Sequence, residues 1–534
     1  MPIHYVRERS FFVRKLVVYL LVFFLTLTVL PFGGVTAAPK VKLGNEVLVE
    51  QYRHLIEGKK IGLVTNQTGI DSQGRSLIDI LAEDPSLDLA ALYAPEHGID
   101  GKAAAGAYVE SYTHPTLGIP VYSLYGATRK PTEAMVKNID VLLYDIQDIG
   151  ARTYTYMSTM NYVIEAGSRY QKPVIVLDRP NPLGGLIVDG PMMEDPYISF
   201  VGIDNLPMAH GMTAGELALF FNRKLGADLT VIPMEGWTRD MIFQDTGLPW
   251  QQTSPNIPDL VSCFGYMATG LGEGTGIYQA DKFKWIGGKG IDAQRFADLL
   301  NASGLPGVRF IPEYQGQAGG VRLDITDYHK FNPAKTGIYA LTYAKHLNDF
   351  QVPKSGNTIV MFDKIMGTAK IGQGLEQKLY PAAMETLYAK ELEQFKQERQ
   401  KYLLYGPYPS GSPANGNTGE VKIFVQGEQV NFDVPPYLDK NNRLLVPFRA
   451  IAEALGATVN WLPQTRQVSM VGRGQILLLT INSNEAVVNG QAISMDTTPV
   501  IKDGRTLVPV RYVGEFLRSI VDWDQKEKLV NIYQ

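Results

Sequence analysis

Glu96 and His97 are neighbours that could together perform acid–base chemistry, because one side chain is a carboxyl and the other an imidazole. They end the stretch from Leu87 to Gly98, which reads L-D-L-A-A-L-Y-A-P-E-H-G. An apolar run of this length that stops at a proline favours a buried parallel strand over an amphipathic helix. Both side chains would then lie just past the carboxyl end of the strand, where open α/β sheets bind ligands. Taken alone, Glu96 could instead cap the following turn, and His97 could be a packed loop residue.

Four further apolar runs also end in polar side chains. The polar residues at or just after their carboxyl ends are Asn66, Gln67, Thr128, Arg129, Asp145, Asp148, Arg152, Tyr154, Tyr156, Asp178, Arg179 and Asn181. Such groups are sparse at the opposite ends of the same runs, and a purely structural sheet has no reason for this polarity. We therefore expect these side chains to gather at one edge of a sheet.

Segments with a helical pattern separate the apolar runs along the chain. Alternating strands and helices predict an α/β fold with a Rossmann-like, doubly wound parallel sheet. Thr213 and Glu216 are spaced as a capping box before a helix expected over 214–222. His210 precedes that helix and could be a ligand group or a packed neighbour, and Asn256 lies in a later S-P-N-I-P segment.

The first 37 residues have the pattern of a secretory signal peptide. Four basic residues precede an apolar run over 16–30, and small residues follow at 35–38. The protein is therefore expected outside the cell or at its surface; an uncleaved anchor is the alternative. Removal of this segment takes away four basic residues and Glu8, which changes the formal charge from -4 to -7. Since no basic arm remains, nucleic acid is not an expected partner.

Residues 420–534 contain an internal repeat, in which R-L-L-V-P-F-R at 443–449 returns as R-T-L-V-P-V-R at 505–511. This tail resembles the copper amine oxidase amino-terminal-like domain, a small α+β module. It has no histidine and no cysteine, so copper is not an expected ligand. The tail could attach the protein to the cell wall or act as a passive spacer. The expected stabilising ion pairs are Arg449 with Glu453 and Arg511 with Glu515.

Seven motifs in the larger part of the chain resemble those of the exo-β-N-acetylmuramidase family of bacterial peptidoglycan glycosidases. The motifs are T-N-Q-T-G, A-P-E-H-G, S-L-Y-G, D-I-Q-D-I-G-A-R-T-Y-T-Y, L-D-R-P-N-P-L-G-G, H-G-M-T-A-G-E-L-A and S-P-N-I-P. The resemblance covers about 41–405. It implies a Rossmann-like domain and an auxiliary domain with the site between them, and removal of terminal N-acetylmuramic acid from the non-reducing end of glycan fragments.

The resemblance and the composition together divide the chain. The predicted parts are a signal peptide (1–37), a Rossmann-like catalytic domain (41–280), an auxiliary domain (281–404), a Pro- and Gly-rich linker (405–419) and the tail module (420–534). One segment departs from the family pattern. Glu273-Gly-Thr275 is followed by G-I-Y-Q-A-D-K-F-K-W-I-G-G, without the G-R-G-T element that family members carry there, so the second wall of the pocket is expected to differ.

The implied reaction needs a proton donor for the departing oxygen and a group that stabilises an oxocarbenium-like transition state. We predict that Glu96 is the donor, because burial between an apolar strand and Pro95 would favour its protonated form. His97 would orient it or contact the sugar. The candidates for the second group are Asp145, Asp148, Asp178 and Glu273, and the 2-acetamido group of the sugar is the alternative.

The lactyl ether of N-acetylmuramic acid carries a carboxylate, for which a guanidinium is a natural ligand. Arg152 and Arg179 are the predicted ligands, although either could instead be tied to a neighbouring aspartate. Tyr154 and Tyr156 alternate on a segment expected to be extended, so only one of them should face the sugar. The further predicted substrate ligands are Asn66, Gln67, Asp148, Asp178, Asn181, His210 and Asn256.

No cofactor or metal is expected. The G-L-G-E-G-T-G segment at 270–276 does not open the first βαβ unit, where a dinucleotide fingerprint belongs. The seven histidines are scattered and form no zinc-binding spacing. The alternative to an enzyme is a glycan-binding surface protein without catalytic activity on the same fold.

Overall fold

The computed structural model describes residues 41–405 and 422–533, with gaps at 431, 433, 435, 439–442, 473–474, 496, 503, 518 and 525–528. The predicted signal peptide and residues 406–419 of the predicted linker lie outside the described residues. Within the described ranges, none of the helices combines the length and the hydrophobicity that a bilayer span requires.

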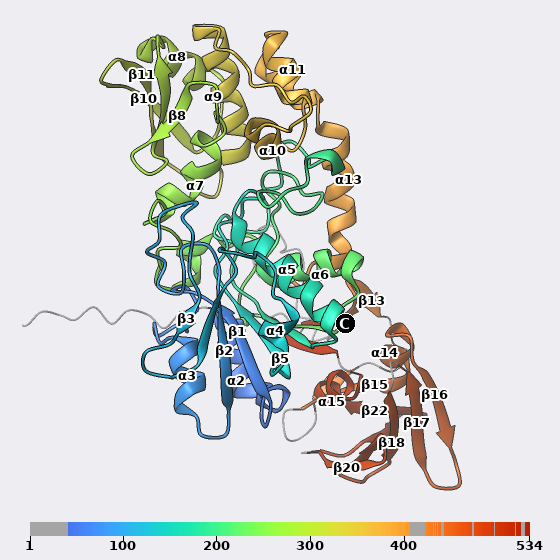
Figure 1. Ribbon diagram of the computed structural model, residues 1–534. Coiled ribbons are helices and arrows are strands. Elements are labelled where there is room, and N and C mark those ends of the chain that lie inside the picture. Colours follow the sequence, from blue (N-terminus) through green and yellow to red (C-terminus); the bar gives the residue numbers. More distant parts are fainter. Residues whose placement is uncertain are drawn as a thin grey trace, which may run out of the picture. The chain divides into compact units, whose positions relative to one another are not determined.

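A seven-stranded sheet forms the centre of the first part of the chain (Figure 1). Its strands are β1 (Lys60–Thr65), β2 (Asp88–Ala94), β3 (Tyr112–Thr113), β4 (Pro120–Ser123), β5 (Val141–Asp145), β6 (Val174–Leu177) and β7 (Leu229–Ile232). Their spatial order is β3-β4-β2-β1-β5-β6-β7, and all pairs except β3 with β4 are parallel. Without β3 the order is 3-2-1-4-5-6, that of the doubly wound fold. The predicted α/β class is therefore confirmed.

Side chains on the two faces of this sheet belong to separate hydrophobic clusters. Leu63 points into a cluster with α2 (Gly44–Gln51) and α3 (Leu77–Glu83). Val64, one residue later, points into the cluster that contains α5 (Thr155–Tyr170) and α6 (Ala214–Leu225). Burial on both faces explains why the strands read as continuous apolar runs. The predicted capping box is also confirmed, because Thr213 and Glu216 each accept a hydrogen bond from the other's backbone N–H.

Residues 260–405 form the auxiliary part, drawn from green to orange in Figure 1. Its sheet has the order β10-β11-β9-β8 and is antiparallel throughout. The elements are α7 (Leu260–Thr269), β8 (Ile277–Ala280), β9 (Trp285–Lys289), α8 (Ala293–Ala302), β10 (Val308–Gln315), β11 (Ala318–Ile325), α9 (Pro333–Asn348), α10 (Met361–Met366), α11 (Lys370–Glu376), α12 (Pro381–Thr386) and α13 (Ala389–Glu398). The boundary predicted at 280 falls inside the hairpin that β8 and β9 form.

The end of the auxiliary part returns to the first sheet. Tyr405 donates from its hydroxyl to Asp178, just after β6, at 2.6 Å. Arg399 donates to the carbonyl oxygen of Gly211 at 2.7 Å. Hydrophobic side chains of both parts belong to one cluster that extends from Val41 to Tyr405. The two parts therefore share a core, which fixes the auxiliary helices against the sheet edge.

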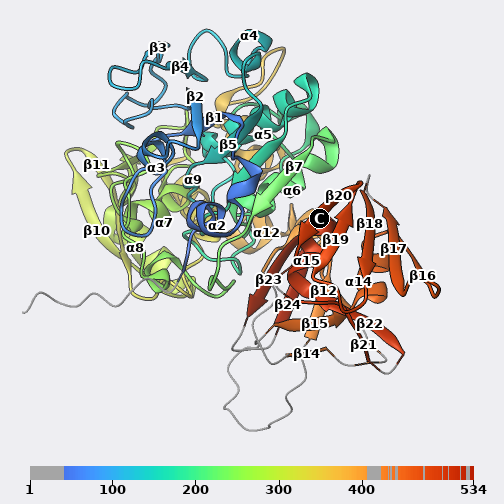
Figure 2. The same cartoon turned by 90° about the horizontal axis from the view of Figure 1, so that it is seen from below.

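The tail has a separate hydrophobic cluster, made of residues between Ile423 and Ile532. The two copies of the repeat become β15 (Leu444–Pro447) and β22 (Arg505–Pro509), which pair antiparallel and lead into α14 (Phe448–Ala454) and α15 (Val510–Phe516). The other strands of the described tail are β12 (Lys422–Val425), β13 (Glu428–Val430), β14 (Tyr437–Leu438), β16 (Thr458–Leu462), β17 (Gln467–Gly472), β18 (Gln475–Thr480), β19 (Glu485–Val488), β20 (Gln491–Ser494), β21 (Val500–Lys502), β23 (Ile520–Asp524) and β24 (Leu529–Tyr533). Figure 2 shows β16 to β20 side by side, and these strands form one antiparallel sheet.

One expectation for the tail is wrong and another lies outside the described residues. Arg449 is exposed, and in the described part of the tail it makes no ion pair with Glu453. The side chains of Arg511 and Glu515 are not among those described. The repeat is therefore held by its buried apolar residues, such as Val446 and Val508, which lie opposite each other on β15 and β22.

Candidate active site

The turn after β2 presents Glu96 and His97. His97 has φ of +71° and Gly98 has φ of +79°, so two successive residues adopt the left-handed conformation and reverse the chain. The Nδ1 atom of His97 lies 2.6 Å from the carbonyl oxygen of Ala103. Because a carbonyl can only accept, this contact places a proton on Nδ1 and leaves Nε2 as the acceptor of a neutral ring.

Glu96 is buried, with 8% of its surface exposed, and both carboxyl oxygens have hydrogen-bond partners. Oε1 accepts from the backbone N–H of Gly106 at 2.9 Å. Oε2 is 2.5 Å from the hydroxyl of Thr155, the first residue of α5. The amino end of this 16-residue helix therefore faces the carboxyl group. A hydroxyl can donate to a carboxylate or accept from a carboxylic acid, so the Thr155 contact is compatible with both forms of Glu96.

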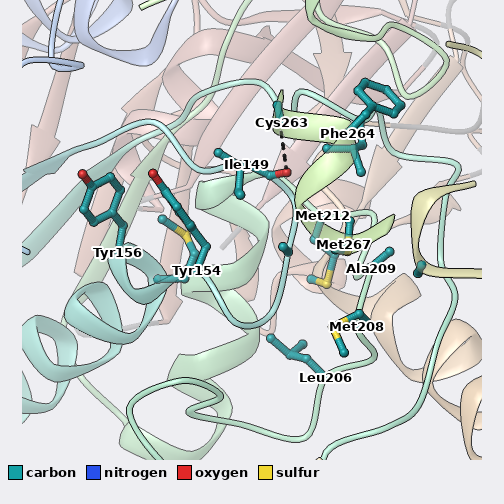
Figure 3. Packing of buried hydrophobic residues seen from close by; sticks show 14 of the residues in the cluster. Ile149, Tyr154, Tyr156, Leu206, Met208, Ala209, Met212, Cys263, Phe264 and Met267 are labelled. Carbon is teal, nitrogen blue, oxygen red and sulfur yellow. Dashed lines mark hydrogen bonds between the residues drawn. The ribbon is translucent and has the colours of Figure 1, made fainter. Parts of the chain in front are cut away.

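Tyr154 and Tyr156 stand side by side near Glu96, with both hydroxyls pointing the same way (Figure 3). Their rings meet edge to face with centroids 4.9 Å apart. The hydroxyls donate to the side chain and the backbone carbonyl of Thr253, at 2.9 and 2.6 Å. Burial and the charge of Glu96 raise the pKa of Tyr156, so its phenol stays protonated. The segment enters α5 rather than continuing as a strand, and both tyrosines line the cavity. Which of them faces the sugar stays a prediction.

These side chains line a cavity of about 360 Å³, a size within the range of small-molecule sites. Residues from the strand exits and from the auxiliary part contribute to its wall: Glu96, His97, Ala105, Tyr125, Arg129, 153–156, 199–201, Ser254, Asn256, Ile257, Tyr266, Phe283, Met361 and Lys364. Phenols, one carboxyl group and two cations therefore surround a space that is partly apolar. Such a lining suits a sugar, whose ring has apolar faces and polar edges.

Two family models match the first two parts of the chain. They are described as the N-terminal and C-terminal domains of exo-β-N-acetylmuramidase NamZ and cover residues 61–261 and 264–405. The peptidoglycan β-N-acetylmuramidase NamZ of Bacillus subtilis is 42% identical over 404 residues, which are 70% of this chain and 97% of that protein. The chain belongs to the NamZ family. The tail, at 424–532, matches the copper amine oxidase N-terminal domain.

Solved structures agree with this membership. A crystal structure of a DUF1343 family protein from Bacteroides fragilis is 38% identical and superposes with a TM-score of 0.63, covering 69% of this chain and all of that chain. A second DUF1343 family protein from the same organism is 27% identical with a TM-score of 0.53, covering 69% of this chain and 99% of the other. The resemblance inferred from the motifs is therefore confirmed.

Five of the predicted NamZ-family site residues line the cavity: Glu96, His97, Tyr154, Tyr156 and Asn256. The remaining predicted residues do not line it: Asn66, Gln67, Asp145, Asp148, Arg152, Asp178, Arg179, Asn181, His210 and Glu273. A second cavity, which Arg179 does line, has room for about 20 Å³, close to the volume of a single water. Most of the other predicted residues serve the fold instead.

Asp145 and Arg179 neutralise each other. Their side chains are 0% and 3% exposed and form a two-pronged ion pair, with N–O distances of 2.5 and 2.9 Å. Asn45 donates to the same carboxylate at 3.1 Å. Because a buried charge without its partner is costly, this pair ties the exits of β5 and β6 together. Both side chains therefore serve the fold, and neither lines the cavity that contains Glu96.

Asp178, directly after β6, accepts hydrogen bonds from four groups. Its carboxyl binds the hydroxyls of Thr213 and Tyr405 and the backbone N–H groups of Arg179 and Gly215. Burial raises the pKa of this fully buried carboxyl to about 7, against the lowering effect of the Tyr405 hydrogen bond. Asp178 therefore anchors α6 and the end of the auxiliary part to the sheet.

Asp148 and His210 also face each other in the interior. The Nε2 atom of His210 is 3.3 Å from Asp148, and the two side chains are 0% and 3% exposed. Of the two interpretations of His210, the packed neighbour is the one that fits. Asn181 is likewise internal and donates to the carbonyl of Met212 at 3.0 Å.

Arg152 is a structural residue rather than a substrate ligand. Its guanidinium donates to the backbone carbonyls of Pro191, Leu206 and Ile365 at 2.6 to 2.8 Å, and 3% of the residue is exposed. Burial lowers its pKa to about 9. Since Ile365 belongs to α10, Arg152 fixes that helix of the auxiliary part against the sheet domain.

The other predicted residues that do not line the cavity lie in loops around it. Gln67 donates to the carbonyls of Gln252 and Thr253 and so holds the segment that both tyrosines bind. Asn66 accepts from Thr68 and stabilises its own turn. Glu273 is exposed and outside the cavity wall.

The segment that departs from the family pattern supplies an aromatic wall. Asp281, Lys282 and Phe283 all have φ between +50° and +68°, a conformation that costs non-glycine residues about 1–2 kcal/mol each. The Phe283 ring packs on Tyr266 with centroids 4.9 Å apart, and its backbone N–H donates to Gln279 at 3.0 Å. The G-R-G-T element is absent here, and a strained turn at 281–283 places Phe283 in the cavity wall instead.

Cavity residues that were not among the predicted site residues include Tyr125, Arg129, Thr155, Phe200, Tyr266, Phe283, Met361 and Lys364. Arg129 was visible as a polar residue after the apolar run that forms β4, but its neighbours gave no reason to prefer it to Arg152 or Arg179. Met361 and Lys364 come from a segment more than 200 residues later than β4, and no local pattern connects them to it.

Proposed function

We propose that this protein is an exo-acting glycoside hydrolase that releases terminal N-acetylmuramic acid from the non-reducing end of peptidoglycan fragments. The observation that carries this proposal is the buried Glu96 carboxyl, held by Gly106 and Thr155 at the wall of a sugar-sized cavity. The Bacillus subtilis relative is named for the same activity. A glycosidase of this kind acts in the turnover of the cell wall.

Glu96 is the proton donor in this proposal. Its proton passes to the glycosidic oxygen as the bond to the anomeric carbon breaks, so the departing sugar leaves as a neutral alcohol. Positive charge then develops on the ring of the remaining sugar. His97, whose Nε2 is an acceptor, would face that charge with its lone pair or hold a water molecule beside it.

The 2-acetamido group of the substrate is the second participant that the lining favours. Among the described wall residues, Glu96 is the one carboxylate, and the other predicted carboxylates lie elsewhere. The acetamido oxygen would attack the anomeric carbon as the leaving group departs, and water would then open the cyclic intermediate while Glu96 takes a proton. The released sugar keeps its anomeric configuration, which proton NMR of the first product measures.

The activity is tested by incubating the protein without its first 37 residues with the disaccharide of N-acetylmuramic acid and N-acetylglucosamine, and identifying the products by mass. Release of free N-acetylmuramic acid supports the enzyme. Binding of the disaccharide without turnover supports the alternative, a glycan-binding surface protein, and contradicts the proposal.

We also propose where the protein acts. The signal-peptide pattern of residues 1–37 supports export, since a basic segment, an apolar run and small residues follow one another there. The tail, with its own hydrophobic core, is a candidate for attachment to the cell wall. Both points fit an enzyme whose substrate lies outside the membrane.

A further inference from the structure

Two cations on the cavity wall have no carboxylate partner. Arg129 follows β4 and Lys364 lies on α10, and neither makes an ion pair with any residue in the part of the chain that the structure describes. Among the described residues of the wall, Arg129 and Lys364 are two basic side chains against one carboxyl group, that of Glu96. An anionic group of a ligand would balance the remaining positive charge.

Arg129 is held in place by aromatic rings rather than by an acid. Its guanidinium carbon lies 4.3 Å from the centre of the Phe200 ring and 5.0 Å from that of Tyr125. Phe200 is in turn stacked on Tyr162, with centroids 5.8 Å apart. The edge N–H groups of a guanidinium match both oxygens of a carboxylate, and no acid in the described part of the chain is paired with those of Arg129.

Lys130, the residue next to Arg129, does have a carboxylate partner. Lys130 is 2.6 and 2.8 Å from the two carboxyl oxygens of Glu165 and does not line the cavity. Its charge is neutralised at the surface of the protein. Lys130 also lies over an aromatic ring, 4.5 Å from the centre of Tyr162, and both Arg129 and Lys130 are exposed. The two residues differ in that Lys130 is paired with Glu165 and lies outside the cavity wall, so Lys130 provides a matched control.

Lys364 reaches the cavity because α10 is fixed. Met361 and Lys364 are three residues apart and so lie on one face of the helix, and both line the wall. The next residue, Ile365, accepts a hydrogen bond from the buried Arg152 at 2.7 Å. Arg152, which the sequence suggested as an anion ligand, instead positions the helix that carries one.

We propose that Arg129 and Lys364 bind the carboxylate of the 3-O-lactyl group and thereby select N-acetylmuramic acid over N-acetylglucosamine, which lacks that group; this inference rests on the proposed function. Tyr125 connects the anion site with the proton donor. Its ring lies 5.0 Å from the guanidinium carbon of Arg129, and Tyr125, Arg129 and Glu96 line the same cavity wall.

The test compares three 4-nitrophenyl β-glycosides: that of N-acetylmuramic acid, its lactamide with a neutral carboxamide, and that of N-acetylglucosamine. Arg129→Met and Lys364→Met should each lower kcat/KM on the acid by about 10- to 100-fold, as expected for a lost charge-assisted hydrogen bond, and lower it far less on the lactamide. Methionine keeps the packing of the replaced side chain. Lys130→Met should behave as the wild type on all three.

Calorimetry with free N-acetylmuramic acid separates this inference from the proposed function. In one outcome, the wild type binds the sugar but turns over none of the glycosides, and both variants lose binding. This result would support the anion site and contradict the enzymatic proposal. If the wild type prefers the acid and both variants keep that preference, the lactyl carboxylate binds elsewhere and the inference is overturned. Unchanged sugar binding in both variants overturns it as well.

Discussion

At the scale of the residue, the contact between Glu96 and Thr155 fixes the position of the proposed proton donor. The carboxyl group is held from one side by a loop N–H and from the other by the first residue of α5. A helix is a rigid support, so the donor has little freedom to turn away from a glycosidic oxygen. Proton transfer needs heavy atoms within about 2.6–3.2 Å, and a small rotation of the carboxyl would lose that distance.

We predict that Thr155→Val lowers kcat by about 10-fold with little change in KM, because it removes the hydrogen bond that positions Glu96 and keeps the shape of the side chain. Thr155→Ser retains the hydroxyl and should restore most of the lost rate. Steady-state kinetics on the 4-nitrophenyl glycoside of N-acetylmuramic acid measures both. An equal loss in the serine and valine variants would show that the methyl group, not the hydroxyl, matters.

At the scale of the element, buried charges decide how helices meet the sheet. Arg152 binds three backbone carbonyls, one of them on α10, and Asp178 binds the amino end of α6 and Tyr405. Both residues follow strands, and both were predicted as site residues from the sequence. Their hydrogen bonds instead join segments that lie far apart along the chain.

For Arg152→Met we expect a loss of about 3 kcal/mol in the free energy of unfolding, because three buried carbonyls lose their donor. Thermal denaturation should show a lower midpoint than that of the wild type. Because Arg129 follows β4 and does not depend on α10, the folded fraction should keep part of the preference for N-acetylmuramic acid over N-acetylglucosamine. A stable variant that cleaves both sugars equally would return Arg152 to the role of substrate ligand.

Asp178 should make stability depend on pH. Its folded pKa of about 7 lies above the ordinary value of 3.8, so between these values the folded state binds more protons than the unfolded state. The free energy of unfolding should therefore fall as pH rises from about 4 to about 7, by up to ~4 kcal/mol from this group. Asp178→Asn should remove that part of the slope, measured by urea denaturation at several pH values. A variant with the slope of the wild type would contradict the assignment.

The elements could be predicted from the sequence better than the site could. Strands buried on both faces appear as apolar runs, so β1, β2, β4, β5 and β6 were each visible, together with their polar ends. All those ends do lie at one edge of the sheet, but charged groups from adjacent strands neutralise one another there, as Asp145 and Arg179 do. Pairing of this kind depends on which strands are neighbours. Spacing along the chain does not contain that information.

The auxiliary part explains the remaining differences. Phe283, Met361 and Lys364 enter the cavity through packing of α7 and α10, which no local pattern near β2 or β5 could indicate. His97 and Glu96 were found because their turn directly follows a strong strand signal. The sequence therefore indicated Glu96 and His97 through their own strand, but it could not indicate the cavity residues that the auxiliary part supplies.

At the scale of the whole molecule, the chain combines a shared core for residues 41–405 with a separate core in the tail. The described residues that line the cavity all lie within 41–405. Tyr405, whose hydroxyl binds Asp178, marks the last described residue before the linker. The catalytic proposal therefore does not depend on the tail.

Deletion of residues 406–534 should leave kcat/KM on a small chromogenic substrate within about two-fold of the full chain, since no cavity residue is lost and the deleted part has its own core. Binding to purified cell walls in a sedimentation assay should weaken if the tail attaches the protein. Equal sedimentation of both forms would favour the passive spacer. A folded truncation without activity would show that the tail contributes to the site.

The central claim is that the buried carboxyl of Glu96 donates the proton that releases N-acetylmuramic acid, and Glu96→Gln tests it most directly. The amide preserves the shape and can still contact Thr155 and Gly106, so the variant should keep the thermal midpoint of the wild type. Mass analysis of the disaccharide reaction should then show a loss of at least about 1000-fold in rate, while Glu273→Gln, at an exposed site outside the cavity, should retain full activity. Release of the sugar by a folded Glu96→Gln protein at the rate of the wild type would contradict the account.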